Sequence, residues 1–289
     1  MLARRAFSAR RPPKDPKNAR IAAFIEKVWS YWKEKGRHDL PWRKTSDPYK
    51  VLVSEIMLQQ TQVQRVIGKY HEFLREFPNV HALARSHLAS VLRVWSGMGY
   101  NRRAKYLHDA AKVIVQKHRG SVPVLYSELV KLPGVGDYSA KAVRVFAYNL
   151  PEVLIETNVR AVFLHHFFPF SKNVADAALG RYIALVISGQ NPRTIYSALM
   201  DYGSRLKQLH PNPSRRSKHH VKQSKFEGSL RQARGAILRA LHPGARAVNS
   251  LRSDLEKSSR SDRDSLRIAL ASLARDGLIQ KKRGNWQIA

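Results

Sequence analysis

Apolar residues recur with the helical period over most of the chain. Residues 21–32, 63–77 and 104–118 each place apolar side chains three and four positions apart, as one buried face of an amphipathic helix does. No apolar run reaches the roughly 20 residues that a membrane-spanning helix needs. The pattern predicts an all-α protein that is long enough to bury a substantial core in one or two domains.

The C-terminal part predicts a smaller, separate unit at residues 229–289. Short amphipathic helices are expected over 230–241, 248–257 and 262–275, and two strand-like segments follow around a turn at 283–285. Three helices followed by a basic hairpin resemble a winged-helix domain that grips DNA, and a protein-docking module is the alternative. The cations of the third helix and of the hairpin are Arg263, Arg267, Arg275, Lys281, Lys282 and Arg283.

The chain is strongly basic, with 52 Lys and Arg against 21 Asp and Glu and a formal charge of +31 over 289 residues. Such a surface repels itself unless a polyanion is near, so nucleic acid is the expected partner. Anionic membrane fits less well, because the aromatic residues are scattered rather than gathered on one basic helix. The chain has no cysteine, which excludes disulfides, thiolate zinc sites and a cysteine-held iron–sulfur cluster.

Two basic segments are not expected to form domains of their own. Residues 1–17 are Arg-rich and broken by prolines, and we interpret them as a disordered basic arm that lies on phosphates. A mitochondrial targeting segment is the alternative to a cytoplasmic, nucleoid-associated protein. Residues 211–228 are expected to form a basic linker. His210, His219 and His220 show no clear ligand spacing, so no metal site is predicted there.

The turn Pro133-Gly134-Val135-Gly136 separates two apolar-periodic segments. Its glycines can adopt backbone angles closed to other residues and leave the main chain open to a ligand. The first amides of the following helix, together with the helix dipole, favour an anion such as phosphate. An ordinary corner between two helices with a glycine cap is the alternative.

Glu55 is the one acidic residue in the otherwise apolar and amide-rich segment 49–63. A carboxyl group in such surroundings prefers to be neutral, so its pKa is expected to rise and it could donate a proton near neutral pH. A surface glutamate is the alternative, but the segment has no obvious polar face. The amides of Gln59–Gln62 suit contacts with base edges, or a solvated helix end.

A second acid, Glu156, lies in the apolar run 153–162. Its ordinary interpretations are an i,i+4 ion pair with Arg160 and a helix cap at Asn158. Further back, the glycine-flanked Tyr100 precedes three cations and suits a wedge pushed into a duplex, although a buried tyrosine is commoner.

Taken together, these segments closely resemble the MutY branch of the helix–hairpin–helix DNA glycosylases. The resemblance covers roughly residues 20–205. It is specific because the segments SEIMLQQTQV and LPGVG occur in this order and at this spacing. The segments are LPWR (40–43), DPYKVLVSEIMLQQTQV (47–63), WSGMGYNRRAKYL (95–107), LPGVGDYSAKAV (132–143), NVRAV (158–162) and ALMDYG (198–203).

The resemblance implies a two-lobed helical glycosylase with DNA across the mouth between its lobes. Residues 48–151 would form a six-helix barrel that contains the helix–hairpin–helix motif, and residues 18–47 and 152–210 would form the other lobe. The hairpin would bind a phosphate, often with a monovalent cation. The hairpin residues are Leu132, Gly134, Val135 and Gly136.

The resemblance also implies roles for individual side chains. Glu55 takes the place of the proton donor, Glu156 that of the second catalytic acid, and Asn158 that of a residue near the reacting sugar. Tyr138 takes a pocket position that is Ser or Tyr in adenine glycosylases and Lys in the bifunctional endonuclease III branch. The remaining assignments are Trp42 and His38 in the base pocket, and Gln60, Thr61 and Tyr100 beside the orphaned base.

The chemistry of base excision needs such a set. Adenine leaves poorly unless a ring nitrogen is protonated, and a carboxylate stabilises the cationic sugar that develops. Because Tyr138 is not an amine, we expect no efficient strand cleavage, and Lys141 is the nearby amine to watch.

The sequence departs from the family pattern in three ways. The second acid is Glu156 rather than Asp, and the extra methylene moves the carboxylate. The C-terminal four-cysteine cluster is absent, and Arg215, Arg216 and Lys218 could hold the phosphates that its loop would hold. The usual module for 8-oxoguanine recognition is not apparent.

We therefore predict a monomeric, monofunctional DNA glycosylase without cofactor or iron–sulfur cluster. Its partner would be double-stranded DNA with a mispaired or oxidised base pair, and it would excise adenine opposite guanine or 8-oxoguanine. A thymine or uracil glycosylase for G·T or G·U pairs is one alternative. A non-catalytic DNA-binding protein, in which Glu156 marks lost chemistry, is the other.

Overall fold

The computed structural model describes residues 16–219, 227–258 and 263–289. Most of the predicted basic arm and part of the predicted linker lie outside these residues. Pro16 and Lys17, which the sequence analysis counted with the arm, begin the first helix. Proline suits this position because the first amide of a helix has no intrahelical partner.

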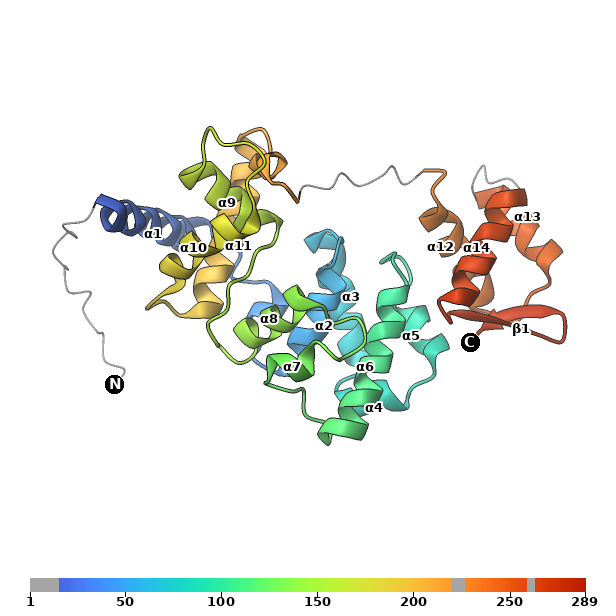
Figure 1. Cartoon of the computed structure of the whole chain (residues 1–289). Helices are drawn as coiled ribbons and strands as arrows, with labels where there is room; N and C mark the ends of the chain where they lie inside the picture. Colours follow the sequence, from blue (N-terminus) through green and yellow to red (C-terminus); the bar gives the residue numbers. More distant parts are fainter. Residues whose placement is uncertain (1–15, 220–226, 259–262) are drawn as a thin grey trace. The chain divides into compact units, whose positions relative to one another are not determined.

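The chain is mostly helical, as predicted, and its one small sheet lies near the C-terminus. No helix in the described part of the chain is long and apolar enough to span a membrane. The elements are α1 (Pro16–Lys35), η1 (Pro41–Arg43), α2 (Pro48–Leu58), α3 (Val63–Glu76), α4 (Val80–Arg85), α5 (Leu88–Val94), α6 (Arg102–His118), α7 (Tyr126–Leu129), α8 (Asp137–Phe146), α9 (Thr157–Phe167), α10 (Asp176–Ile187), α11 (Pro192–Leu209), η2 (Pro213–Arg216), α12 (Leu230–Leu241), α13 (Val248–Ser258), α14 (Arg263–Arg275), β1 (Ile279–Lys282) and β2 (Asn285–Ile288) (Figure 1).

The chain divides into two compact units. The first combines residues 1–38 with 151–220, and the second combines 39–150 with 221–289. Residues 39–47 therefore belong with the second unit, whereas the sequence analysis placed them in the first lobe. The physical reason is local packing. The 3₁₀ helix η1 contacts α2, and the Trp42 and Tyr70 rings pack edge to face with their centroids 5.7 Å apart.

The first unit is built around α9 and α11, which pack against each other, with α1 against α11 and α10 against α9 (Figure 1). Phe24 on α1 fills its core with Phe163 and Phe167 on α9, at ring distances of 5.6 and 5.1 Å. At the end of α1, Arg37 binds the buried Asp201 of α11 through its backbone amide at 2.7 Å and its Nε at 2.6 Å. This ion pair holds the C-terminal end of α1 against α11.

The second unit is built around α2. Asp47 caps α2 by accepting from the amides of Tyr49 and Lys50, and Pro48 supplies a fixed φ for its first turn. Every residue from Val51 to Met57 is buried. A helix that is apolar on all sides belongs in a core, and α2 contacts α3, α6 and α8.

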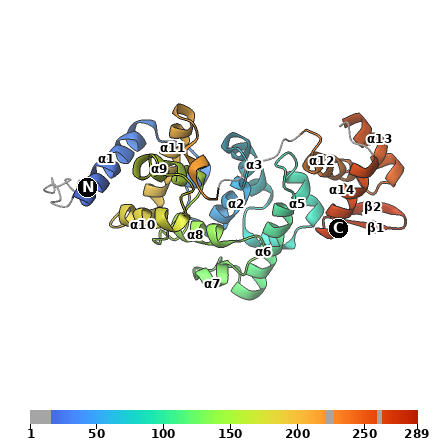
Figure 2. The ribbon, with the colours of Figure 1, turned by 45° about the horizontal axis from the view of Figure 1, so that its top comes forward.

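The C-terminal part has the elements that the sequence predicts. Helices α12 to α14 pack together over Ile237, Leu251 and Leu273, and β1 pairs antiparallel with β2 (Figure 2). The hairpin turns at Arg283 and Gly284, both with positive φ, and this turn chemistry sets its register.

Candidate active site

Glu55 is a buried carboxyl group on the central helix of the second unit. Only 8% of the residue is exposed, and its neighbours Ser54 and Ile56 are also buried. The surface position that was the alternative for Glu55 is therefore wrong. Its helix is tied to α8 by the Gln59 amide, which donates to the Ser139 hydroxyl at 3.1 Å. The sequence analysis did not single out Ser139.

The predicted hairpin connects α7 to α8. Gly134 has a φ of +75°, and a Cβ there would lie 2.6 Å from the Cβ of Tyr106, so both the backbone angle and the close approach require glycine. Gly136 is the N-cap of α8 and supplies no side-chain cap. Leu132 and Val135 are buried, and the Val135 amide donates to the Leu132 carbonyl at 3.1 Å. That amide closes the turn itself.

Tyr138 is half-buried in the first turn of α8. Lys141, the amine one turn further on, forms an ion pair with Asp137 at 2.8 Å. The hydrogen bond from Lys141 lowers the pKa of Asp137, and a second hydrogen bond from Tyr126 adds to this. Lys141 is thus engaged on the outer part of the hairpin.

Arg103 is a buried cation that joins the end of α2 to the loop before α6. Its Nη1 donates to the carbonyls of Ile56, Met57 and Gln59 at 3.0, 2.9 and 2.5 Å. Its Nη2 donates to the Gly99 carbonyl at 3.1 Å and to the Thr61 hydroxyl at 3.0 Å. Burial lowers the pKa of Arg103 to about 10.

Arg103 therefore brings together the residues that were predicted to lie beside the orphaned base. Thr61 accepts its hydrogen bond, and the loop that presents Tyr100 is bonded to the same guanidinium. Gln60 is exposed next to Thr61, and both Gln60 and Tyr100 have positive φ, at 53° and 47°. The sequence analysis counted Arg103 only as one of three cations after Tyr100, so this role was missed.

Trp42 and His38, the predicted base-pocket residues, fall in different units. Trp42 is partly buried against the core of the second unit. His38 is exposed at the end of α1, where its Nε2 lies 2.9 Å from the Trp32 carbonyl.

Glu156 is the N-cap of α9. Its Oε1 accepts from the amides of Asn158 and Val159, both at 2.7 Å, and its Oε2 accepts from the Asn158 side-chain amide at 3.0 Å. Two amides and the helix dipole thus surround a carboxylate whose charge they stabilise. The side chains of Glu156 and Asn158 thus contact each other.

Both ordinary interpretations of this segment are wrong. Arg160 does not bind Glu156 but forms a bidentate pair with Asp176, at 3.1 Å from Nε and 2.7 Å from Nη2. The cap is Glu156 rather than Asn158, because the glutamate side chain folds back onto the first turn.

Helix α11 holds this first turn in place. At Gly203 the two backbones come so close that a Cβ would lie 2.2 Å from the Asn158 carbonyl oxygen. One turn further on, the pKa of Lys207 is lowered, because burial outweighs the opposing effect of the nearby Glu156 charge. Lys207 is a cation near Glu156 that the sequence analysis did not single out.

Residues 53–192 match the family model described as HhH-GPD superfamily base excision DNA repair protein. Over this stretch the chain is similar to the HhH-GPD superfamily. Its MutY-like character is supported by relatives named adenine DNA glycosylase. That of Buchnera aphidicola subsp. Baizongia pistaciae is 36% identical over 182 residues, which are 63% of this chain and 52% of the relative. That of Mycobacterium tuberculosis is 46% identical over 132 residues, 45% of this chain and 43% of the relative.

The chain thus spans about half the length of the curated relatives that it matches. Among solved structures, a thermostable thymine-DNA glycosylase superposes with a TM-score of 0.58 at 25% identity, covering 66% of this chain and 88% of that one. The HhH-GPD fold predicted from the sequence is therefore confirmed.

The basic residues predicted for DNA binding lie at two places in the chain. In the first unit, Arg215 and Lys218 are exposed around η2, but Arg216 donates to the carbonyls of Leu164 and Phe168 at 2.9 and 2.8 Å. Arg216 therefore caps α9, which restricts its guanidinium. In the C-terminal part, five of the predicted cations are exposed: Arg267 and Arg275 on α14, Lys281 and Lys282 on β1, and Arg283 in the turn.

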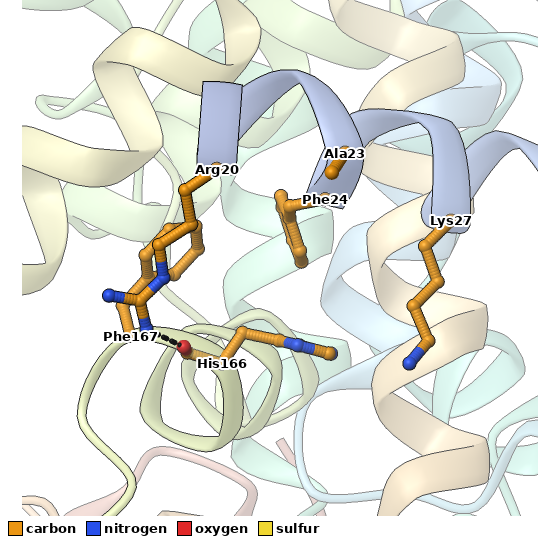
Figure 3. A pocket seen from close by; sticks show the side chains of 6 residues that line it. All are labelled: Arg20, Ala23, Phe24, Lys27, His166 and Phe167. Atoms are coloured by element: carbon orange, nitrogen blue, oxygen red, sulfur yellow. Dashed lines mark hydrogen bonds between the residues drawn. The ribbon is translucent and has the colours of Figure 1, made fainter. Parts of the chain in front are cut away.

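A pocket of about 220 Å³ opens at the C-terminal end of α9, where Arg20 donates to the His166 carbonyl (Figure 3). His166 lies ten residues after Glu156, or about 15 Å along a helix, so this pocket is not the Glu156 site. The ring of His166 is bonded to the Tyr202 hydroxyl at 3.0 Å. Burial, with help from His165, Lys27 and Arg20, lowers the pKa of His166 to about 4.

This histidine predicts an acid-sensitive first unit. In the unfolded chain its pKa is about 6.5, so the unfolded state binds the proton first and stability falls as pH drops from about 6.5 to about 4. We expect His166→Gln, whose amide can replace the hydrogen bond to Tyr202, to reduce this dependence. Thermal melting at about pH 7 and about pH 4.5 checks this, with the exposed His219→Gln as control. An unchanged pH dependence in His166→Gln would contradict it.

Proposed function

We propose that this chain is a monofunctional DNA glycosylase that hydrolyses the N-glycosidic bond of adenine opposite guanine or 8-oxoguanine. The observation that carries the proposal is Glu55, the single acidic residue of α2, buried in an apolar core helix that is bonded to the hairpin helix. Loss of hydration disfavours the charged form of such a carboxyl group, and so favours the acid that base release needs.

In the proposed reaction the adenine is flipped out of the duplex and Glu55 gives a proton to a ring nitrogen. The bond between that base and C1′ then breaks, and positive charge develops on the sugar. The Glu156 carboxylate, to which two backbone amides donate, stabilises this charge electrostatically or by a transient bond. Water adds its hydroxyl to C1′, and its proton restores the acid.

Asn158 and Tyr138 have supporting roles. The Asn158 side-chain amide bonds to Glu156 and so orients the carboxylate near the sugar. Tyr138 offers a phenol where a lyase needs an amine, so strand cleavage is not expected. The substrate is duplex DNA held by the hairpin and the basic surfaces, and the chain is proposed to act as a monomer.

A thymine or uracil glycosylase for G·T and G·U pairs is the second candidate. The structural likeness to a thymine-DNA glycosylase favours it, at a TM-score of 0.58. Single-turnover reactions on A·G, A·8-oxoguanine, T·G and U·G duplexes, followed by alkali, separate the candidates. The proposal expects alkali-dependent breaks at adenine; breaks only at thymine or uracil support the second candidate, and intact strands in all four duplexes support a non-catalytic protein.

Glu156→Asp tests the longer acid. Aspartate is itself a preferred N-cap, so α9 keeps its cap while the carboxylate moves back by one methylene, to the family's usual length. We expect base release to be equal or faster in single-turnover assays, with thermal stability unchanged. A collapse of the rate would mean that the surroundings of Glu156 are built for the longer side chain.

A further inference from the structure

The side chain of Tyr100 is held by the C-terminal part of the chain. Arg231, in the first turn of α12, donates from Nη1 to the Tyr100 hydroxyl at 2.6 Å. The same guanidinium lies over the Tyr100 ring, 5.3 Å from its centroid. A charged hydrogen bond and a cation–π contact to one ring restrict its position strongly.

Tyr100 also contacts a second arginine. Arg103 lies 5.4 Å from the centroid of the same ring, and its Nε donates to the Tyr100 carbonyl at 3.4 Å. The loop itself has unusual backbone angles, since Gly97, Gly99 and Tyr100 all have positive φ. A non-glycine residue keeps a φ of 47° only where its surroundings enforce it. The ring thus contacts two arginines, one from each part of the second unit.

A second contact joins the two parts close to this loop. Asp276, after α14, receives Arg102 of α6 at 2.5 Å and also binds Arg234 of α12. Its side chain is only 6% exposed. Burial alone would raise the pKa of Asp276, but the hydrogen bonds from Arg102 and Arg234 outweigh it and lower that pKa. The shared carboxylate therefore binds α12 to the start of α6, two residues after Tyr100.

We propose that the C-terminal domain, residues 229–289, sets the position of Tyr100 for insertion into DNA, with Arg231 as the positioning residue. This rests on the proposed function, in which Tyr100 enters the duplex beside the orphaned base. A ring that is already fixed loses less conformational freedom on binding than a ring on a free loop. The domain would then contribute to recognition of the damaged pair through a residue of the barrel as well as through its own cations.

A double-mutant cycle in the full chain tests this, with Arg231→Ala, Tyr100→Phe and the double variant. Tyr100→Phe removes one oxygen and keeps the stacking ring, so it does not threaten folding. Affinity is measured for a duplex with a stable abasic-site analogue, over a range of salt concentrations. Arg239→Ala is the matched control, because it removes an exposed arginine from the same helix.

We expect each single variant to bind about three- to tenfold more weakly, as the loss of one charge-assisted hydrogen bond allows. The double variant should be no weaker than the weaker single variant, because both remove the same bond. Arg239→Ala should show only a change in salt dependence.

Three results would overturn the proposal. Effects that multiply in the double variant, or a reduced salt slope in Arg231→Ala with Tyr100→Phe unaffected, would make Arg231 a plain phosphate contact. Wild-type affinity in both single variants would show that the bond has no role. The binding assay needs no catalysis. Coupling between the two substitutions without base release would therefore contradict the proposed function alone. Base release without such coupling would contradict only this inference.

Discussion

We expect Glu55→Gln to abolish base release and to leave duplex binding nearly unchanged. Glutamine has the shape of the neutral glutamic acid and keeps an amide for hydrogen bonding, but it cannot give up a proton. Loss of one general acid typically costs 10²–10⁴-fold in rate, and adenine depends on protonation to leave. Single-turnover release and affinity for an uncleaved mismatch duplex are measured on the same preparation.

The control for this experiment is Glu26→Gln, the same change at an exposed position of α1. It should behave as the wild type in both assays. Retained turnover in Glu55→Gln would remove Glu55 as the acid. A parallel loss of duplex binding would instead make its role one of structure or DNA contact.

Gly203→Ala displaces the first turn of α9 and, with it, Glu156 and Asn158. The added Cβ would lie 2.2 Å from the Asn158 carbonyl oxygen and 2.6 Å from the carbonyl carbon, and backbone cannot rotate out of the way as a side chain can. Overpacking of this kind costs about 1–3 kcal/mol, against a gain of about 0.5–1 kcal/mol from replacing a helical glycine. We expect lower stability in urea unfolding, and base release reduced by about 10²-fold, because catalytic groups tolerate little displacement.

Gly180→Ala is the matched control for Gly203→Ala. Gly180 lies in α10, and a Cβ there would meet only Val153 Cγ1 at 3.6 Å, an ordinary contact. This variant should be as stable as the wild type or slightly more stable, with full activity. Equal behaviour of the two alanine variants would mean that the approach of α11 does not position Glu156.

The sequence predicted best where one segment carried its own signal. Residues 51–58 are apolar apart from Ser54 and Glu55, so this helix was expected to be buried, and Glu55 with it. The elements of the C-terminal domain followed from helical spacing and from a glycine turn between two short strands. In both cases local preference and tertiary packing agree.

Prediction failed where the partner of a side chain lies far away in the chain. Arg103 was counted only as one of three cations after Tyr100, because nothing local shows that six carbonyls and a hydroxyl converge on it. Arg160 had a plausible partner four residues back, yet it binds Asp176. Glutamate is an uncommon N-cap, so the cap at Glu156 was assigned to Asn158. Long-range contacts of this kind require the fold.

In the proposed reaction the buried carboxyl group of Glu55 supplies the proton. The pH dependence of single-turnover base release by the wild type tests this role most directly. Over the pH range in which the protein stays folded, general acid catalysis predicts a rate that falls as pH rises and the acid loses its proton. The same decline should persist in Glu26→Gln, while Glu55→Gln stays at background throughout. A rate that rises with pH, or stays flat over the whole range, would contradict the central role of Glu55.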